Sequence, residues 1–312
     1  MVTIGVDIGG TKIAAGAVDG RGEIIDRITR DTPGTDSDSV MTAIVEVIRT
    51  LQEEHAVTAV GVAPAGFVSS DRSRMLFSPN LALTGVAIRE RVMKDVGCAV
   101  VVENDANAAG WAEYRFGAGR DTTNMVMLTI GTGLGGAVIA NNTLIRGAFG
   151  VAGELGHLRL VPDGRPCNCG QFGCWERYAS GTALEQIAQS GAVSQVERAG
   201  ALLERADGVP HRITGHDVTY LADAGDEYCR ELIATLGRWI GEGIAMVASI
   251  LDPGQVVVGG GVAAAGELLL EPARTRYDEL LSARSERPHL EICEATLGND
   301  AGIVGAADLA RH

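Results

Sequence analysis

Three glycine-rich segments of this 312-residue sequence follow short apolar runs. Glycine lets backbone N–H groups come close to a phosphate, so each segment could bind one. In the first segment Lys12 adds positive charge and Thr11 adds a hydroxyl donor. Asp7 ends the preceding apolar run and could hold Mg²⁺ through water. An ordinary Gly-Gly hairpin with a solvated lysine remains the alternative for this segment.

The second segment, 131–136, formally matches the dinucleotide-binding pattern G-x-G-x-x-G. That pattern requires a helix after the loop, whereas the residues that follow are typical of a hairpin. We therefore interpret this segment as a phosphate loop, with a third approach from 259–261 beside a nucleoside. The candidate nucleotide-binding residues are Asp7, Gly9, Gly10, Thr11, Lys12, Gly131, Thr132, Gly133, Gly259, Gly260 and Gly261.

Asp105 follows the apolar run 99–102 and begins a helical pattern that continues to Tyr114. Aspartate at such a junction often caps the helix. A carboxylate there could also accept the proton of an alcohol during phosphoryl transfer, a reaction that needs positioning and charge stabilisation more than covalent help. The spacing alone leaves both interpretations open.

Cys167, Cys169 and Cys174 lie close together downstream of His157. Three thiolates and one imidazole fit a closed structural Zn²⁺ site, which has no open position for a catalytic water. The Cys-x-Cys pair is too close for a relaxed disulfide, although Cys174 could pair elsewhere. The isolated cysteines at 98, 229 and 293 are expected to be buried small hydrophobic residues.

Glu154 and Glu176 flank the cysteine cluster. Carboxylates at fixed positions accept hydrogen bonds from sugar hydroxyls and penalise substrates that lack them. Two surface glutamates would explain the same residues.

Strands and helices alternate along the chain, which is typical of an α/β fold. Strands are predicted over 2–7, 12–18, 23–28, 58–62 and 99–102, with a helix over 38–55. The strand–loop–strand–turn–strand pattern restarts at 125–130, 137–140 and 143–145, about 120 residues later, which predicts a duplicated domain. A long helix over about 226–251 should end at Asp252-Pro253, before a strand at 256–258.

The sequence has 26 Lys and Arg against 40 Asp and Glu, a formal net charge of −14. This balance and the 4% aromatic content argue against a nucleic-acid partner. No run approaches the roughly 18 apolar residues of a membrane span, and the N-terminus lacks the basic region of a signal peptide. We therefore expect a cytoplasmic protein without membrane partners, assembled as a homodimer or homotetramer.

Together the motifs resemble the ROK family of bacterial sugar kinases and repressors, and within it the bacterial glucokinases. This family is part of the actin, hexokinase and heat-shock-chaperone ATPase superfamily. The resemblance covers nearly the whole chain and rests on Asp7-x-Gly-Gly-Thr-Lys, Glu103-Asn104-Asp105, the 131–136 loop, Gly153-Glu154-x-Gly-His157 and Cys167-x-Cys-Gly-x-x-Gly-Cys174-x-Glu176. It implies two α/β domains around a central ATP-binding cleft, a small one of 1–110 plus about 298–312 and a large one of 111–297.

The resemblance also implies ATP-dependent phosphorylation of the 6-hydroxyl of glucose, with ATP, Mg²⁺ and a structural Zn²⁺. Asp105 would be the base, and His157 would offer one ring nitrogen to zinc and the other to the sugar. The implied zinc ligands are His157, Cys167, Cys169 and Cys174. The implied sugar contacts are Gly66, Asn104, Asp105, Glu154, His157 and Glu176.

Three features depart from the family pattern or divide its members. Pro64-Ala65-Gly66 stands where relatives often carry Pro-Gly, and Ala137 stands where a further glycine is common. The repressors carry a helix-turn-helix before the first glycine loop, and this chain has no room for one there.

A kinase for another hexose, such as an N-acetylated amino sugar or mannose, is the alternative enzyme. A sugar-responsive regulator without turnover is the alternative outside the enzymes.

Overall fold

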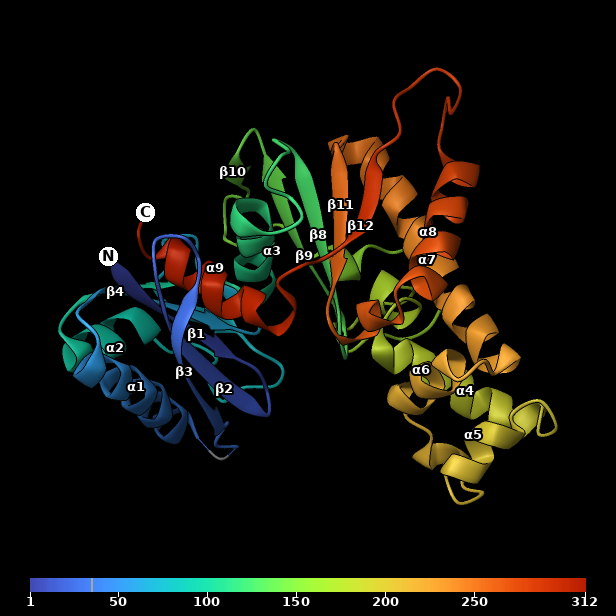
Figure 1. The fold of residues 1–312 in the computed structure, drawn as a ribbon, viewed down its shortest axis with the longest axis horizontal. Coiled ribbons are helices and arrows are strands. Elements are labelled where there is room, and N and C mark those ends of the chain that lie inside the picture. Colours follow the sequence, from blue (N-terminus) through green and yellow to red (C-terminus); the bar gives the residue numbers. More distant parts are fainter. Residues whose placement is uncertain (35) are drawn as a thin grey trace. The chain divides into compact units, whose positions relative to one another are not determined.

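The computed structural model describes residues 1–34 and 36–312 (Figure 1). The chain forms two compact units. Unit 1 comprises Met1–Met127, Gly136–Gly153 and Thr296–His312, and unit 2 comprises Leu128–Gly135 and Glu154–Ala295. The domain bounds implied by the resemblance, 1–110 with about 298–312 and 111–297, stay a prediction.

The sheet of unit 1 has the strand order β3-β2-β1-β4-β7. Its three N-terminal strands form an antiparallel meander, and β4 and β7 extend it in parallel from β1. The central strands are apolar and buried, whereas the edge strand β3 alternates half-buried and exposed positions at first. The bounds are β1 Val2–Ile8, β2 Lys12–Val18, β3 Ile24–Asp31, β4 Val57–Pro64 and β7 Ala99–Val102.

Unit 1 also contains four helices, a small hairpin and, within 125–127 and 136–153, part of the second sheet. The predicted helix over 38–55 is α1, Ser37–Glu54, whose first turn is capped by the Asp36 side chain accepting from Ser39 N. Its buried stripe runs from Val40 to Leu51 with helical spacing. The other elements are β5 Phe67–Val68, β6 Met75–Phe77, α2 Ile88–Val96, α3 Asp105–Phe116, a 3₁₀ turn at Gly298–Asp300 and α9 Ala301–Leu309.

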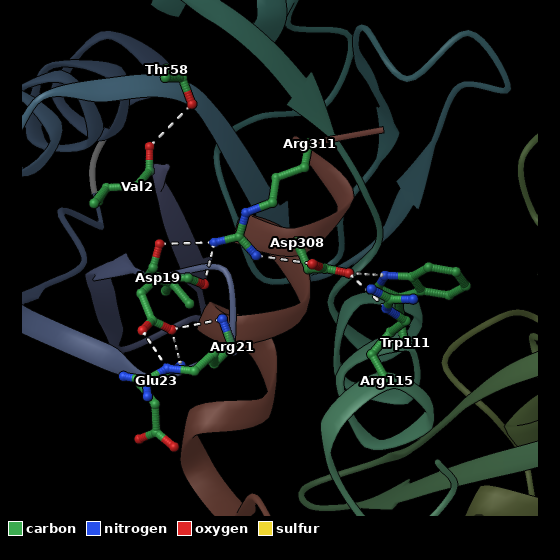
Figure 2. A network of polar contacts seen from close by, with 10 residues as sticks. Val2, Asp19, Arg21, Glu23, Thr58, Trp111, Arg115, Asp308 and Arg311 are labelled. Atoms are coloured by element: carbon green, nitrogen blue, oxygen red, sulfur yellow. Dashed lines mark hydrogen bonds and ion pairs between the residues drawn. The ribbon is translucent and has the colours of Figure 1, made fainter. Parts of the chain in front are cut away.

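The last helix, α9, is fastened to α3 and to the end of β2 (Figure 2). The Asp308 carboxylate, 2% exposed, accepts from Trp111 Nε1 at 2.9 Å, Arg115 Nε at 3.2 Å and Arg311 Nη1 at 2.9 Å. Arg311 also donates to the carbonyls of Val18 and Asp19. Both oxygens of this buried carboxylate thus accept hydrogen bonds, so α9 is held against α3 and against the end of β2.

The second sheet has the order β10-β9-β8-β11-β12, which repeats the order of the first. The predicted duplication is therefore confirmed. Its strands are β8 Met125–Ile130, β9 Leu134–Ala140, β10 Thr143–Leu144, β11 Gln255–Gly259 and β12 Glu291–Glu294. The strand expected to begin at residue 137 begins at Leu134, because this leucine is buried in the core, and the glycine loop shortens to 131–133.

Helices make up most of unit 2. They are α4 Gly181–Ser194, α5 Gly200–Arg205, α6 Gly215–Asp223, α7 Glu227–Leu251 and α8 Glu267–Leu280, with 3₁₀ turns at Leu155–His157, Trp175–Arg177, Pro210–Arg212 and Gly261–Ala265. The long helix α7 ends as predicted, at Asp252 in the left-handed conformation just before Pro253.

Within the described residues, α7 is the one helix that is long and apolar enough to cross a membrane, by length and composition only. Charged residues interrupt its sequence, so it contains no continuous run of about 18 apolar residues. Of its apolar window, 56% is buried, and the helix packs on α6 and α8. This is the pattern of a core helix.

The three isolated cysteines divide between core and surface. Cys229 is buried on α7 as expected, but Cys98 and Cys293 are half-buried, so the expectation was wrong for those two. Cys98 precedes β7, and Cys293 lies on β12; both strands are at sheet edges, where side chains have fewer neighbours.

Candidate active site

Asp105 is the first residue of α3, directly after the end of β7. The cap of this helix is Asn104, whose Oδ1 accepts from Asn107 N at 2.9 Å. The interpretation of Asp105 as the cap was therefore wrong, because its neighbour takes that position. Asn104 Nδ2 donates to Asp105 Oδ1 at 2.9 Å and to the Gly66 carbonyl at 3.0 Å. The Asp105 carboxylate is thus oriented by a neighbour and is not consumed by the helix end.

Two carboxylates of unit 1 have strongly perturbed acidity. Burial raises the pKa of Asp105 to about 6, against the lowering effect of hydrogen bonds from Ala106 N, its own N–H and Asn104. Burial, and then repulsion from Asp105, raise the pKa of Asp7, the last but one residue of β1, to about 7. A carboxylate with a pKa near 6 is a stronger proton acceptor than an exposed one and is still ionised at neutral pH.

Gly66 is required by the backbone itself. Its φ is +134°, and a β-carbon there would lie 2.4 Å from the Phe77 carbonyl oxygen. Ser78 Oγ donates to the Ala65 carbonyl at 2.8 Å and fixes the same turn. Although Ala65 separates Pro64 from Gly66, the Gly66 carbonyl still accepts the hydrogen bond from Asn104 Nδ2.

The first glycine loop joins β1 to β2. Gly9 N donates to the Lys12 carbonyl at 2.9 Å, and Thr32 Oγ1 donates to the Gly9 carbonyl at 2.8 Å. A β-carbon at Gly9 would meet only the Lys12 carbonyl oxygen, at 3.6 Å, and one at Gly10 would make ordinary contact with Asn80. The fold itself therefore does not require these glycines. Thr11 and Lys12 are exposed, which leaves both the phosphate loop and the plain hairpin open.

The second and third glycine loops meet in unit 2 at the start of α4. Gly181 N donates to the Gly131 carbonyl at 2.8 Å, and Thr182 Oγ1 donates to the Thr132 carbonyl at 2.7 Å. Gly260 has a φ of +89°, and a β-carbon there would lie 2.6 Å from the Ile130 carbonyl oxygen. A β-carbon at Gly131 or Gly261 would meet nothing within 4 Å. Near the start of α4, the backbone of Gly131 and Gly261 therefore has free space beside it.

Sequence reasoning missed the contribution of Ser180, Gly181 and Thr182. The Ser180 side chain caps α4 by accepting from Ala183 N. A serine before a helical pattern is the signal that could have found this helix start. Its proximity to the 131–133 loop is a long-range contact that spacing does not reveal.

The predicted zinc ligands come together in unit 2. The ligand atoms of His157, Cys167, Cys169 and Cys174 all lie within 4.8 Å of one another. Cys167 Sγ is 3.8 Å from His157 Nδ1, and Cys169 Sγ is 3.6 Å from Cys174 Sγ. These are the separations expected for ligands about 2.0–2.3 Å from one tetrahedral ion. Burial raises the pKa of the Cys167 and Cys174 thiols, so a bound cation would be required for both to be thiolates at neutral pH.

The two glutamates are both partly buried. Glu176 Oε1 is 3.0 Å from Cys167 Sγ and 3.8 Å from His157 Nδ1, so this side chain lies against the cluster. Glu154 begins the 3₁₀ turn that carries His157, and its carbonyl accepts from His157 N at 3.1 Å. The interpretation of both as plain surface glutamates is therefore weakened. Their roles as sugar ligands stay predictions.

The candidate residues thus form groups within each unit. Unit 1 holds Asp7, the first glycine loop, Gly66, Asn104 and Asp105, and unit 2 holds the second and third loops, Glu154, Glu176 and the metal cluster. The chemistry available in unit 1 is proton acceptance beside a carboxylate pair. In unit 2, backbone N–H groups of the glycine loops can bind an anion. A metal ion in the Cys₃His cluster would hold nearby side chains in place for hydrogen bonding to a ligand.

The sequence pattern that defines the ROK family matches residues 3–312. The chain is 46% identical over 311 residues to a glucokinase of Streptomyces coelicolor, covering 100% of this chain and 98% of the relative. It is 32% identical over 313 residues to an N-acetylmannosamine kinase of Escherichia coli, covering 100% and 99%. A crystal structure of a ROK family glucokinase from Streptomyces griseus in complex with glucose and AMPPNP matches with a TM-score of 0.91 and 47% identity, covering 100% and 99%. The predicted actin-like α/β fold is confirmed.

Proposed function

Because the chain belongs to the ROK family, we propose that it is an ATP-dependent glucokinase that phosphorylates the 6-hydroxyl of glucose. The observation that carries the proposal is the Asp105 carboxylate, oriented by Asn104 and raised in pKa at the start of α3. The glucokinases of Streptomyces coelicolor and Streptomyces griseus, similar over the full length, support glucose as the sugar and ATP as the donor.

Asp105 accepts the proton of the 6-hydroxyl as its oxygen attacks the γ-phosphorus of ATP. The bond from the γ-phosphorus to the β,γ-bridging oxygen breaks, and ADP leaves with that oxygen. The reaction gains little from covalent catalysis, so the main contribution of Asp105 is a proton acceptor in a fixed orientation. Asn104 supplies the orientation through its hydrogen bond to Oδ1.

Backbone N–H groups at the glycine loops bind the phosphates of ATP. The open space at Gly9, Gly131 and Gly261 supports this assignment, because the fold does not demand glycine there. Lys12 adds charge to the first loop, and Gly259 and Gly260 complete the third. Asp7 would hold Mg²⁺ through water, and the ion would supply charge neutralisation for the phosphates.

The four-ligand cluster fits a structural Zn²⁺, held by His157 through Nδ1 and by the three thiolates. When bound, the ion supplies rigidity to the segment 154–176 and not chemistry. The free Nε2 of His157, with Glu154 and Glu176, would then hydrogen-bond sugar hydroxyls. In unit 1, the proposed sugar contacts are Gly66 and Asn104.

The proposal places the enzyme in the cytoplasm, at the entry of glucose into glycolysis, as a homodimer or homotetramer. One observation favours a second candidate, an amino-sugar kinase, namely the relative from Escherichia coli named N-acetylmannosamine kinase. The lower identity of that relative makes glucose the first choice.

Steady-state kinetics on glucose, mannose, N-acetylglucosamine and N-acetylmannosamine, each with MgATP, tests the proposal. We expect the highest kcat/KM for glucose. A preference for an N-acetylated sugar would favour the second candidate. No turnover of any sugar, combined with saturable glucose binding, would indicate a regulator.

A further inference from the structure

Glu103 is a buried carboxylate that the proposed reaction does not use. It is 3% exposed and lies between the end of β7 and Asn104. Its Oε2 accepts from Arg146 Nε at 2.7 Å, while Arg72 Nε lies 3.6 Å away, too far for a hydrogen bond. Replacing a buried ion pair by apolar groups is often neutral for stability, so stability alone is a weak explanation for it.

The other oxygen of Glu103 faces Asn104 and Asn107. Oε1 accepts from the backbone N–H of Asn104 at 3.2 Å and from Asn107 Nδ2 at 3.2 Å. Asn107 N in turn donates to Asn104 Oδ1 at 2.9 Å. Glu103 therefore fixes both the backbone of Asn104 and the helical turn that Asn104 caps.

A short chain of hydrogen bonds leads from this carboxylate to Asp105. With Oδ1 of Asn104 held by Asn107 N, the amide can present only Nδ2 to Asp105 Oδ1, at 2.9 Å. A rotation of the Asn104 side chain would break both hydrogen bonds. The side-chain orientation of Asp105 thus depends on Glu103 indirectly, through Asn104.

The partner of Glu103 belongs to a loop with a separate role. Arg146 begins the loop 146–153, which is closed by Ala152 N donating to the Arg146 carbonyl at 3.1 Å. Gly150 of the loop lies so close to β5 that a β-carbon would sit 2.2 Å from the Val68 carbonyl oxygen. The loop ends at Gly153, immediately before Glu154, a proposed sugar ligand.

We propose that Glu103 and Arg146 are a positioning pair for the proposed kinase reaction: they hold Asn104 so that the Asp105 carboxylate points along one direction, and they anchor the loop that leads to the sugar-binding segment. Neither residue touches the substrate. The inference rests on the proposed function, because its main readout is glucose phosphorylation.

Glu103→Gln tests the pair, with Glu113→Gln as its matched control. Glu113 is a buried carboxylate on α3 that accepts from Ala118 N, Leu297 N and Thr296 Oγ1, away from Asn104. We expect Glu103→Gln to lower kcat about 100-fold, the cost of misaligning a reacting group, and to raise the KM for glucose by a smaller factor, because Asn104 is also a proposed sugar contact. The control should lower Tm while kcat stays near the wild-type value.

Arg146→Gln and Arg146→Lys extend the test if Glu103→Gln does not fold. The glutamine variant should lower kcat, and the lysine variant should restore part of it, because lysine still offers one charged donor to Oε2. Equal kcat losses in Glu103→Gln and Glu113→Gln, or a Glu103→Gln variant with wild-type kcat and a lower Tm, would reduce Glu103 to a structural residue. A wild-type protein that does not phosphorylate glucose overturns the proposed function instead, which keeps the two failures apart.

Discussion

A β-carbon added at Gly302 would lie 2.7 Å from Oδ2 of Asp7. The start of α9 therefore closes the space behind this carboxylate, and the position of Asp7 is set by a helix almost 300 residues away in the chain.

Gly302→Ala should displace the Asp7 carboxylate and weaken the proposed Mg²⁺ site. We expect the Mg²⁺ concentration for half-maximal activity to rise about 10–100-fold, the usual effect of disturbing a group that orients a metal ligand. Mg²⁺ titrations of the kinase rate provide the measurement. Gly200→Ala is the matched control, because a β-carbon there meets nothing within 4 Å. Equal Mg²⁺ dependence in both variants would remove Asp7 from metal binding.

Asp105→Asn should abolish proton acceptance without removing the hydrogen bond from Asn104, because the amide keeps an oxygen. We expect kcat to fall by roughly 10²–10⁴-fold. Glucose binding, measured by calorimetry, should persist. Asp121→Asn is the control, since this side chain is almost fully exposed. Near-normal turnover of Asp105→Asn would show that another group accepts the proton.

The raised pKa of Asp105 predicts an acidic limb in the pH profile of kcat. The ionised carboxylate is the base, so activity is lost as pH falls through about 6. Asp7, whose pKa is raised to about 7 by burial and by repulsion from Asp105, is the neighbouring carboxylate, and saturating Mg²⁺ would keep it ionised.

Asn104→Ala separates Asp105 from the titration of ATP itself. The hydrogen bond from Asn104 lowers the pKa of Asp105, so its loss should move the acidic limb to higher pH. A limb that stays fixed in this variant would belong to the nucleotide.

The raised pKa of Asp105 also predicts a pH dependence of folding stability that is opposite to that of activity. A carboxyl group whose pKa is higher in the folded than in the unfolded state favours folding at low pH, and this contribution is lost as pH rises from about 4 through about 6. Asp105→Asn should therefore raise the free energy of unfolding of the ligand-free protein at pH 8, on the order of 2 kcal/mol.

The gain should shrink toward pH 4, where the wild-type side chain is neutral as well. Urea unfolding at both pH values measures it. A gain of equal size at both would point to altered packing and not to charge burial.

Metal analysis should find about one zinc per chain, the stoichiometry of a single closed four-ligand site. Cys169→Ser should lose the ion and raise the KM for glucose, because Glu176 lies against the same cluster. Cys98→Ser, a change at a half-buried cysteine outside the cluster, should keep both. Wild-type glucose kinetics in a zinc-free protein would break the link between metal and sugar binding.

Local patterns predicted much of this fold, because each depends on residues close in sequence. The helix over 38–55, the strand at 99–102 and the end of α7 at Asp252 follow from periodicity and from proline. The same reasoning could not decide whether Asn104 or Asp105 caps α3, since both side chains cap well and they are adjacent. A hydrogen bond from Asn107 N decides it.

Long-range contacts account for what the sequence did not reveal. The pattern of residues does not show that Thr182 holds the 131–133 loop, or that Glu103 meets Arg146. Both contacts join segments tens of residues apart, and either partner alone is an ordinary polar residue. The Cys₃His cluster was predictable because three of its four residues lie within one short segment.

The fastening of α9 by Asp308 and Arg311 has a consequence for synthesis. Arg311 is 293 and 292 residues from its partners Val18 and Asp19, so the β1–β2 hairpin is made long before the helix that holds it. A nascent chain therefore carries Asp7 and Asp105 without α9 until the intervening residues have been added. Chains that terminate before α9 are expected to be inert and readily degraded.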